Sequence, residues 1–254
     1  MPQPLTRVEL QVIYEDAELL VINKPAGLVC HPSKDGPMSS LIGRVRLYLG
    51  DGWRPHMVNR LDRETSGVTV LAKSDDVALE LRKLWECRAV EKDYLAVVHG
   101  HVGAEQGLID APMGKDESSP VAIKDCVRAD GLPSQTEFIV ERRFWKRITD
   151  ADQEPKAFSL LRVLPRTGRK HQIRIHLAHL GHPIVGDKIY GGDEDLYLAL
   201  VEGRLKEEQK RRLILPHQAL HARAVRFEWH GRRVEFCCEP EQWYKEFAEL
   251  KIKS

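Results

Sequence analysis

Short apolar runs, bounded by glycine, proline and polar residues, recur along the whole chain. Residues 19–22, 68–72 and 94–98 are almost wholly apolar, which is typical of buried strands. Residues 158–164 and 225–229 follow the period-two alternation of a strand that buries one face. These five segments predict the strands of a sheet.

A second pattern, with apolar positions three and four residues apart, predicts helices. One begins after Ser74, whose side chain can cap it, one covers residues 171–180, and one begins after Pro240. Gly181 lies where the middle helix should end, because glycine accepts the left-handed backbone of a helix C-terminus. Residues 194–212 are rich in charges and predict one exposed helix.

The segments between these elements indicate the class of fold. Residues 23–27, Asn-Lys-Pro-Ala-Gly, predict a turn after the first strand. Residues 111–135 are rich in Pro, Gly, Ser and Asp and predict an extended loop with one short strand at most. Strands and helices are interspersed without a regular strand-helix-strand period, so we expect an α+β protein with a mixed or antiparallel sheet.

Composition narrows the class of protein. The 254 residues, 42% of them hydrophobic, suffice for one globular domain or two small ones. No apolar stretch reaches the roughly 20 residues of a membrane span, and the first residues lack the apolar region of a signal peptide, so we expect a cytoplasmic protein. The five cysteines form no Cys-x-x-Cys pair, which argues against a disulfide framework and against cysteine-bound zinc.

The charge is unevenly distributed. The net charge is +1, but residues 142–176 hold ten Lys or Arg against three Asp or Glu, a local charge of +7 that leaves −6 for the rest. Such a basic stretch is the footprint expected of a protein that binds nucleic acid. A solvated surface segment explains the charge alone equally well.

The stretch 59–67, Asn-Arg-Leu-Asp-Arg-Glu-Thr-Ser-Gly, carries the clearest chemistry. It places one carboxylate, Asp62, between Arg60 and Arg63, just before the buried strand at 68–72. Catalytic groups often lie on loops held by a rigid strand. A nearby guanidinium favours the ionised carboxylate, so Asp62 could act as a nucleophile or a base.

Stretch 59–67 closely resembles the catalytic motif of the RluA-type pseudouridine synthases, which usually reads His-Arg-Leu-Asp-x-x-Thr-Ser-Gly. In this chain Asn59 replaces the usual His. Further segments resemble the same family in the family's order: residues 13–16 and 21–27, the tyrosine motif at 91–100, the basic motif at 167–187, and residues 218–222.

The resemblance implies a fold and a reaction. The fold would be α+β, with a central mixed, largely antiparallel sheet flanked by helices and loops and a basic RNA-binding cleft. The reaction would convert uridine in RNA to pseudouridine without a cofactor. Asp62 would be the essential carboxylate, which either attacks C1′ or removes a proton from the sugar. Arg174 would pair with Asp62, and Tyr94 would lie against the target base.

The resemblance also implies residues that bind the substrate. Arg60 would fill the gap left by the flipped base, with Asn59 beside it, and base flipping is needed because C1′ and C5 are inaccessible in a stacked helix. Leu220 would pack under the base, and Arg169 and His171 would belong to the RNA surface. The histidines from 171 to 182 do not have the spacing of His-Glu-x-x-His, so no metal is expected.

We therefore predict a monomeric, cytoplasmic RNA pseudouridine synthase whose partner is ribosomal or transfer RNA. Residues 1–11 would form a tail and residues 12–254 a single catalytic domain, without the small N-terminal RNA-binding domain of some relatives. Two other classes stay open: a catalytically silent RNA-binding or ribosome-assembly protein on the same fold, and a glycosidic hydrolase with Glu64 as the second carboxylate.

Overall fold

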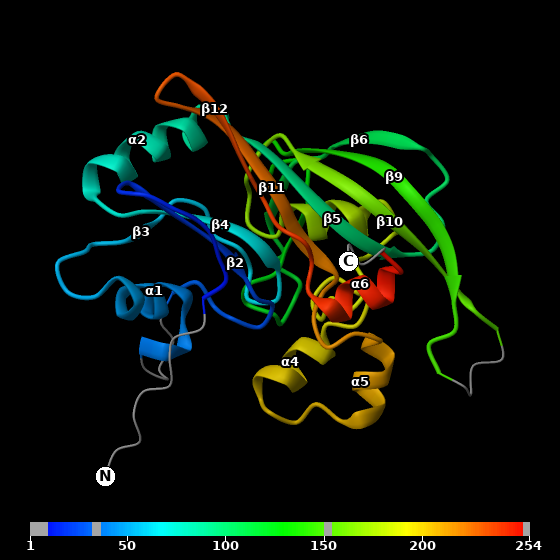
Figure 1. Ribbon diagram of the computed structural model, residues 1–254. Helices are drawn as coiled ribbons and strands as arrows, with labels where there is room; N and C mark the ends of the chain where they lie inside the picture. Colours follow the sequence, from blue (N-terminus) through cyan, green and yellow to red (C-terminus); the bar gives the residue numbers. More distant parts are fainter. Residues whose placement is uncertain (1–9, 32–36, 150–153, 251–254) are drawn as a thin grey trace, which may run out of the picture. The chain divides into compact units, whose positions relative to one another are not determined.

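The structure is a computed structural model that describes residues 10–31, 37–149 and 154–250 (Figure 1). The chain forms two compact units. The first comprises Met1–Glu91 and Ala222–Glu241, and the second comprises Lys92–His221 and Gln242–Ser254. The predicted tail at 1–11 lies almost wholly outside the described residues, and the predicted division into tail and catalytic domain stays a prediction.

The first unit contains a sheet with strand order β1-β2-β4-β11, to which β3 adds on β4 and β12 adds on β11. Its elements are β1 (Val12–Glu15), β2 (Leu19–Lys24), η1 (Pro37–Ser39), α1 (Leu41–Leu49), β3 (His56–Met57), β4 (Ser66–Ala72), α2 (Asp75–Glu86), β11 (Leu220–Trp229) and β12 (Arg232–Cys237). Strand β11 begins two residues before this unit.

Strand β2 is buried throughout, and its residues 19–22 are all apolar, because both of its faces are covered. Leu19 and Val21 pack into a core with Leu81 of helix α2, whereas Leu20 and Ile22 pack into a second core with helix α1. Figure 1 shows the two helices on either side of strands β2 and β4. A continuous apolar run is therefore the expected sequence of this strand.

The second unit contains four antiparallel strands in the order β5-β10-β9-β6 and a separate two-stranded pair, β7-β8. Its elements are β5 (Glu91–His99), β6 (Gln106–Asp110), β7 (Met113–Lys115), β8 (Asp125–Val127), β9 (Gln135–Lys146), β10 (Lys156–Pro165), α3 (Gln172–His179), α4 (Asp195–Val201), α5 (Glu207–Leu213) and α6 (Gln242–Ala248). Helices α3 and α6 share one apolar core with the strands, in which Phe158 and Phe247 meet edge to face at 5.2 Å.

The predicted α+β class, with a largely antiparallel sheet flanked by helices, is confirmed. All five predicted strands form, and so do the helices after Ser74, over 171–180 and after Pro240. Gly181 has the expected positive φ, at 87°. The predicted turn is shorter than expected, because β2 continues through Lys24 and the turn lies at residues 26–27.

Two local predictions were wrong. Residues 111–135 contain two short strands, β7 and β8, rather than one at most. Residues 194–212 form two helices rather than one, because the chain turns at Gly203, where φ is 68°. There Arg204 N donates to Ala199 O and Gly203 N to Leu200 O, which is the Schellman arrangement that ends a helix.

No helix among the described residues is long and apolar enough to cross a membrane. The described part of the chain also contains no group of three or more His, Cys, Asp or Glu side chains arranged to hold a metal ion.

Candidate active site

Asp62 is half-buried on the loop that leads from β3 to β4 in the first unit. The loop closes with a turn in which Thr65 N donates to Asp62 O at 3.2 Å. Of the two neighbouring arginines, Arg60 is exposed, and Arg63 Nε donates to Gly27 O at 3.2 Å. That these arginines hold Asp62 ionised stays a prediction.

Asn59 anchors the start of this loop on strand β4. Its Nδ2 donates to Val68 O at 3.1 Å, and its Oδ1 accepts from Val70 N at 2.7 Å. Val58 N also donates to Val70 O, so the Asn59 amide extends the short β3–β4 ladder by one further step. Asn supplies one donor and one acceptor for this task. Contact between Asn59 and RNA stays a prediction.

Lys24 fixes the other part of the loop, and sequence analysis missed it. The side chain is fully buried, and its Nζ donates to Leu28 O at 2.8 Å, Pro25 O at 2.9 Å and Arg63 O at 3.1 Å. The ammonium group thus ties the turn after β2 to the loop of Asp62. Burial lowers the pKa of Lys24 to about 8, although the nearby Cys30 and Asp62 oppose that shift.

Gly67 allows the backbone next to this loop to pack closely. Its φ is 116°, and a Cβ at this position would lie 2.2 Å from Ala222 O on β11. Any other residue would combine backbone strain with a clash against main-chain atoms, which cannot move aside as a flexible side chain could.

Arg174 lies on helix α3 in the second unit, where only 5% of the residue is exposed. Its Nε donates to Asp187 Oδ2 at 2.6 Å and its Nη2 to Asp187 Oδ1 at 2.9 Å, a bidentate pair. Asp187 Oδ1 also accepts from Ile189 N and Tyr190 N. Burial opposes ionisation of Asp187, but the charge of Arg174 and these hydrogen bonds outweigh it, so the pKa of Asp187 lies below its usual value.

Tyr190 completes the surroundings of Arg174. Its ring centroid lies 5.0 Å from the guanidinium carbon of Arg174, within the range of a cation–π contact. Its Oη accepts from Asp125 N at 3.3 Å and lies 2.9 Å from His171 Nδ1. Burial raises the pKa of Tyr190, so the phenol stays protonated and can donate its proton to Nδ1 of a neutral His171. One ring nitrogen of His171 therefore serves the protein itself.

Gln172 holds the loop before α3 in place. Its Oε1 accepts from Thr167 Oγ1 at 2.7 Å and from Arg169 N at 3.0 Å, and its Nε2 donates to Gln135 O and Thr136 Oγ1, both at 2.9 Å. All its donors and acceptors are used by the protein. The loop is thereby fixed on strand β9, while the side chain of Arg169 remains exposed.

Tyr94 and Leu220 both belong to the apolar core of the second unit. Tyr94 is half-buried on β5 opposite Val163 of β10, and Leu220 is 4% exposed. The preceding Asp93 is buried and pairs with Arg162 at 2.9 Å. The roles of Tyr94 and Leu220 toward a substrate stay predictions.

The basic stretch at 142–176 is largely neutralised by the protein itself. Seven of its ten cations lie within 4 Å of a carboxylate in the described part of the chain: Arg142, Arg143, Lys146, Arg162, Arg166, Lys170 and Arg174. Arg147, Lys156 and Arg169 remain without such a partner there. The charge available to a polyanion is therefore smaller than the sequence suggested.

Comparison with known proteins points to the family that the sequence resembles. Residues 18–179 match the model of the family described as RNA pseudouridylate synthase. The chain is 31% identical over 247 residues to the ribosomal large subunit pseudouridine synthase D of Yersinia pestis, covering 90% of this chain and 68% of the relative. It is 37% identical over 223 residues to the protein of the same name from Xanthomonas campestris, covering 87% of this chain and 62% of the relative.

A solved structure, human RNA pseudouridylate synthase domain containing 1, superposes with a TM-score of 0.70 and 26% identity over 94% of this chain and 86% of the human chain. The chain therefore belongs to the RNA pseudouridylate synthase family, a class of isomerases that act on RNA. The resemblance noted in the sequence is confirmed. The chain spans between 62% and 68% of the length of the two bacterial relatives.

Proposed function

We propose that the protein isomerises specific uridines of ribosomal or transfer RNA to pseudouridine, with Asp62 as the catalytic carboxylate. The observation that carries this proposal is the loop of Asp62. It matches the family motif, and it is held through Asn59 at one end and through Lys24 and Arg63 at the other. A reactive group fixed in this way loses little freedom when the substrate binds.

In the proposed reaction the N1–C1′ bond breaks, the uracil turns, and a C5–C1′ bond forms. C5 then loses its proton and N1 gains one, so no oxidant, reductant or net water is needed. Asp62 serves either by attacking C1′ or by removing a proton from the sugar. Following the family motif, Arg174 would support the charge of Asp62 and Tyr94 would lie against the base.

The pair of Arg174 with Asp187 supports the proposed role of Arg174. Asp187 engages Nε and Nη2, and the ring of Tyr190 covers one face of the guanidinium group. A guanidinium group that is fixed along one edge presents its other donors in a defined direction. Asp187 and Tyr190 are thus proposed as positioning residues.

The substrate is proposed more specifically as ribosomal RNA, because the relatives from Yersinia pestis and Xanthomonas campestris carry that name. The protein is further proposed to act as a monomer in the cytoplasm through residues 12–254. Mapping pseudouridines in ribosomal and transfer RNA from a strain that lacks the gene identifies the target. Loss of a site in transfer RNA alone would overturn the ribosomal assignment.

The first test is the Asp62→Asn variant, assayed by tritium release from RNA that contains 5-tritiated uridine. We expect release to fall to background while the affinity for RNA stays within about twofold, because one neutralised carboxylate changes few phosphate contacts. Asp51→Asn, an exposed aspartate in the same unit, is the matched control and should behave like the wild type. Appreciable release by Asp62→Asn would remove Asp62 from its assigned role.

Chromatography of the digested RNA product separates the proposed function from the two other classes. Pseudouridine supports the isomerase, and free uracil would indicate the hydrolase that uses Glu64. An unchanged digest across ribosomal and transfer RNA would indicate a silent RNA-binding protein.

A further inference from the structure

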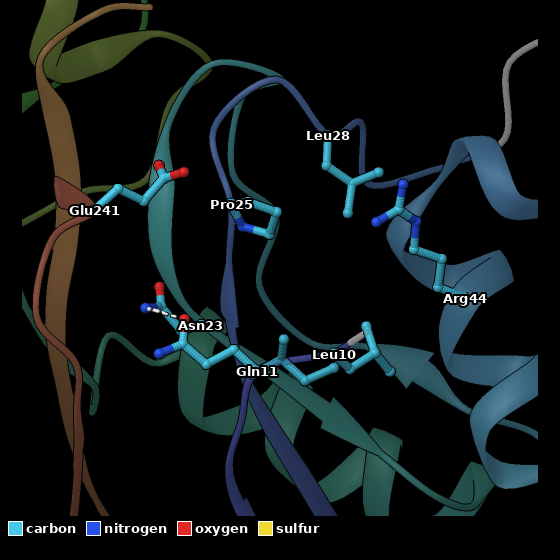
Figure 2. Close-up of a pocket in the computed structure, with 8 residues that line it drawn as sticks. Leu10, Gln11, Asn23, Pro25, Leu28, Arg44 and Glu241 are labelled. Atoms are coloured by element: carbon cyan, nitrogen blue, oxygen red, sulfur yellow. Dashed lines mark hydrogen bonds between the residues drawn. The ribbon is translucent and has the colours of Figure 1, made fainter. Parts of the chain in front are cut away.

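A cavity of about 330 Å³ lies in the first unit, beside the turn that follows strand β2 (Figure 2). It is lined by Leu10, Gln11, Ile22, Asn23, Pro25, Leu28, Arg44 and Glu241. The volume falls within the range of natural small-molecule sites. No residue of the proposed catalytic set lines it.

The walls combine apolar surface with two amides. Asn23 is 4% exposed, and its Nδ2 donates to Gln11 Oε1 at 3.0 Å and to Glu239 O at 3.3 Å. Both donors of Asn23 are therefore used, which leaves its Oδ1 as an acceptor and Gln11 Nε2 as a donor. The apolar walls include Leu10 and Pro25, which are partly exposed and offer the kind of surface on which a planar base packs.

Two charged groups lie toward opposite sides of the group of side chains in Figure 2. Glu241 Oε2 accepts from Ala26 N at 3.0 Å, and its other oxygen has no partner among the described residues. Arg44 Nε donates to Met38 O at 2.9 Å, and its two terminal nitrogens likewise have no partner in the described part of the chain. The cavity thus offers acceptors on one side and, on the other, a guanidinium group whose terminal nitrogens have no partner among the described residues.

The cavity shares a wall with the support of the catalytic loop. Pro25 and Leu28 line it with their side chains, while their carbonyl groups accept from Lys24 Nζ, which also binds Arg63 O. A ligand in the cavity therefore lies against the same turn that holds the loop of Asp62.

We propose that this cavity binds a nucleotide that flanks the target uridine in the RNA substrate, an inference that rests on the proposed function. The base lies against Leu10 and Pro25 and carries an exocyclic amino group, which donates to Glu241 and Asn23. Its phosphate pairs with Arg44. Adenine, guanine and cytosine have such an amino group, and uracil does not, so the cavity selects against uridine at this position.

The direct test needs no catalysis. Methyl NMR of Ile22, Leu10 and Leu28 is followed while the 5′-monophosphates of adenosine, guanosine, cytidine and uridine are added at millimolar concentrations. We expect saturable shifts of these methyl groups with the three amino-bearing nucleotides and weaker binding of uridine monophosphate. Inorganic phosphate alone should not shift the methyl groups. Equal shifts with all four nucleotides, or shifts no larger than at distant methyl groups, would overturn the proposal.

Two variants with matched controls assign the contacts. Arg44→Met should weaken nucleotide binding about tenfold or more, because a hydrogen-bonded charge is removed. Arg46→Met, an exposed arginine on the same helix, should change nothing. Glu241→Gln can still accept from Ala26 N but exchanges the second acceptor for a donor, so it should narrow the difference between cytidine and uridine nucleotides. Glu228→Gln is its exposed control. Equal behaviour of either variant and its control would refute the assigned contact.

Kinetics on RNA then connects the cavity to the reaction. Arg44→Met should raise KM for RNA and reduce the slope of log KM against log salt by about one, the contribution of one phosphate contact. A wild-type enzyme that converts no uridine in any RNA would refute the proposed function, while the mononucleotide titration would still decide the cavity. Conversely, suppose that the wild type is active while Arg44→Met leaves KM and its salt dependence unchanged. That result would refute only the proposal that the cavity binds a flanking nucleotide.

Discussion

The burial of the ion pair between Arg174 and Asp187 lets us predict how much stability is lost when the pair is broken. Asp187→Asn keeps the shape of the side chain but removes its charge, and the guanidinium of Arg174, only 5% exposed, loses its bidentate ion pair with this carboxylate. Removing one partner of a buried pair costs about 3–5 kcal/mol. Because Asn can still accept one hydrogen bond, we expect about 3 kcal/mol, or roughly 6–12 °C in Tm.

The chain contains a control with the same two contacts and much less burial. Arg128 and Asp130 form a bidentate pair through Nε at 2.6 Å and Nη2 at 2.8 Å, and the Asp130 side chain is 71% exposed. Asp130→Asn should leave the urea midpoint almost unchanged, since solvent screens exposed pairs. If Asp187→Asn were no more destabilising than Asp130→Asn, the argument from burial would be refuted.

The pH dependence provides a second readout for the same variant. The pKa of Asp187 is lowered in the folded protein, so its contribution to stability is present above the unfolded pKa of about 3.9 and is lost as pH falls through the lower folded value. The gap in unfolding free energy between wild type and Asp187→Asn should therefore shrink below about pH 4. The variant should also lower kcat more than it changes KM, because Arg174 is proposed to act on the reaction rather than on RNA affinity. A gap that persists at low pH would contradict this account.

Three further predictions concern the loop of Asp62. Arg60→Ala should lower kcat/KM more on a structured hairpin than on an unstructured RNA with the same uridine, because an unstacked base needs no replacement in a helix; equal losses at one fixed salt concentration would argue against base replacement. Lys24 has a pKa of about 8, below its unfolded value of about 10.4, so its buried charge destabilises the fold below pH 8 and this cost disappears as pH rises to about 10.4. Wild-type urea stability should therefore rise relative to Lys24→Met across that window, and parallel curves would contradict the lowered pKa. Gly67→Ala should cost about 3 kcal/mol more than Gly52→Ala, since both have positive φ but only Gly67 meets a carbonyl oxygen, 2.2 Å from the added Cβ; equal thermal shifts would show that strain alone matters.

Much of the fold could be predicted because its signals are local. The runs at 19–22 and 68–72 are almost wholly apolar, and the structure shows cores on both faces of those strands. Ser74 and Gly181 mark helix ends through conformations that their own residue types prefer. The single helix expected at 194–212 failed because the charged residues continue across Gly203, where the chain turns.

The candidate functional residues likewise divide into those that a local sequence signal identifies and those that only the tertiary structure reveals. The motif around Asp62 is contiguous, so the sequence alone determined which carboxylate to propose and which family the chain resembles. Two partners were missed because they are distant in sequence: Lys24, which holds the loop of Asp62, reaches Arg63 across 39 positions, and Arg174 in the second unit meets Asp187 only through the loop after α3. Neither the partner of Lys24 nor that of Arg174 can be predicted from the composition of the chain or from its hydrophobic periodicity.

Charge illustrates most clearly what only the tertiary structure decided. Ten cations in a stretch of 35 residues predicted a basic surface, yet seven of them pair with carboxylates, most of which lie on other segments of the chain. The energy of a charge depends on the distance and burial of its neighbours, which sequence order does not specify. The sequence by itself determined most elements of the fold and which carboxylate to propose as reactive. The tertiary structure decided which charges are neutralised, which buried groups hold the loop of Asp62, and where a cavity lies whose polar groups are partly without partners among the described residues.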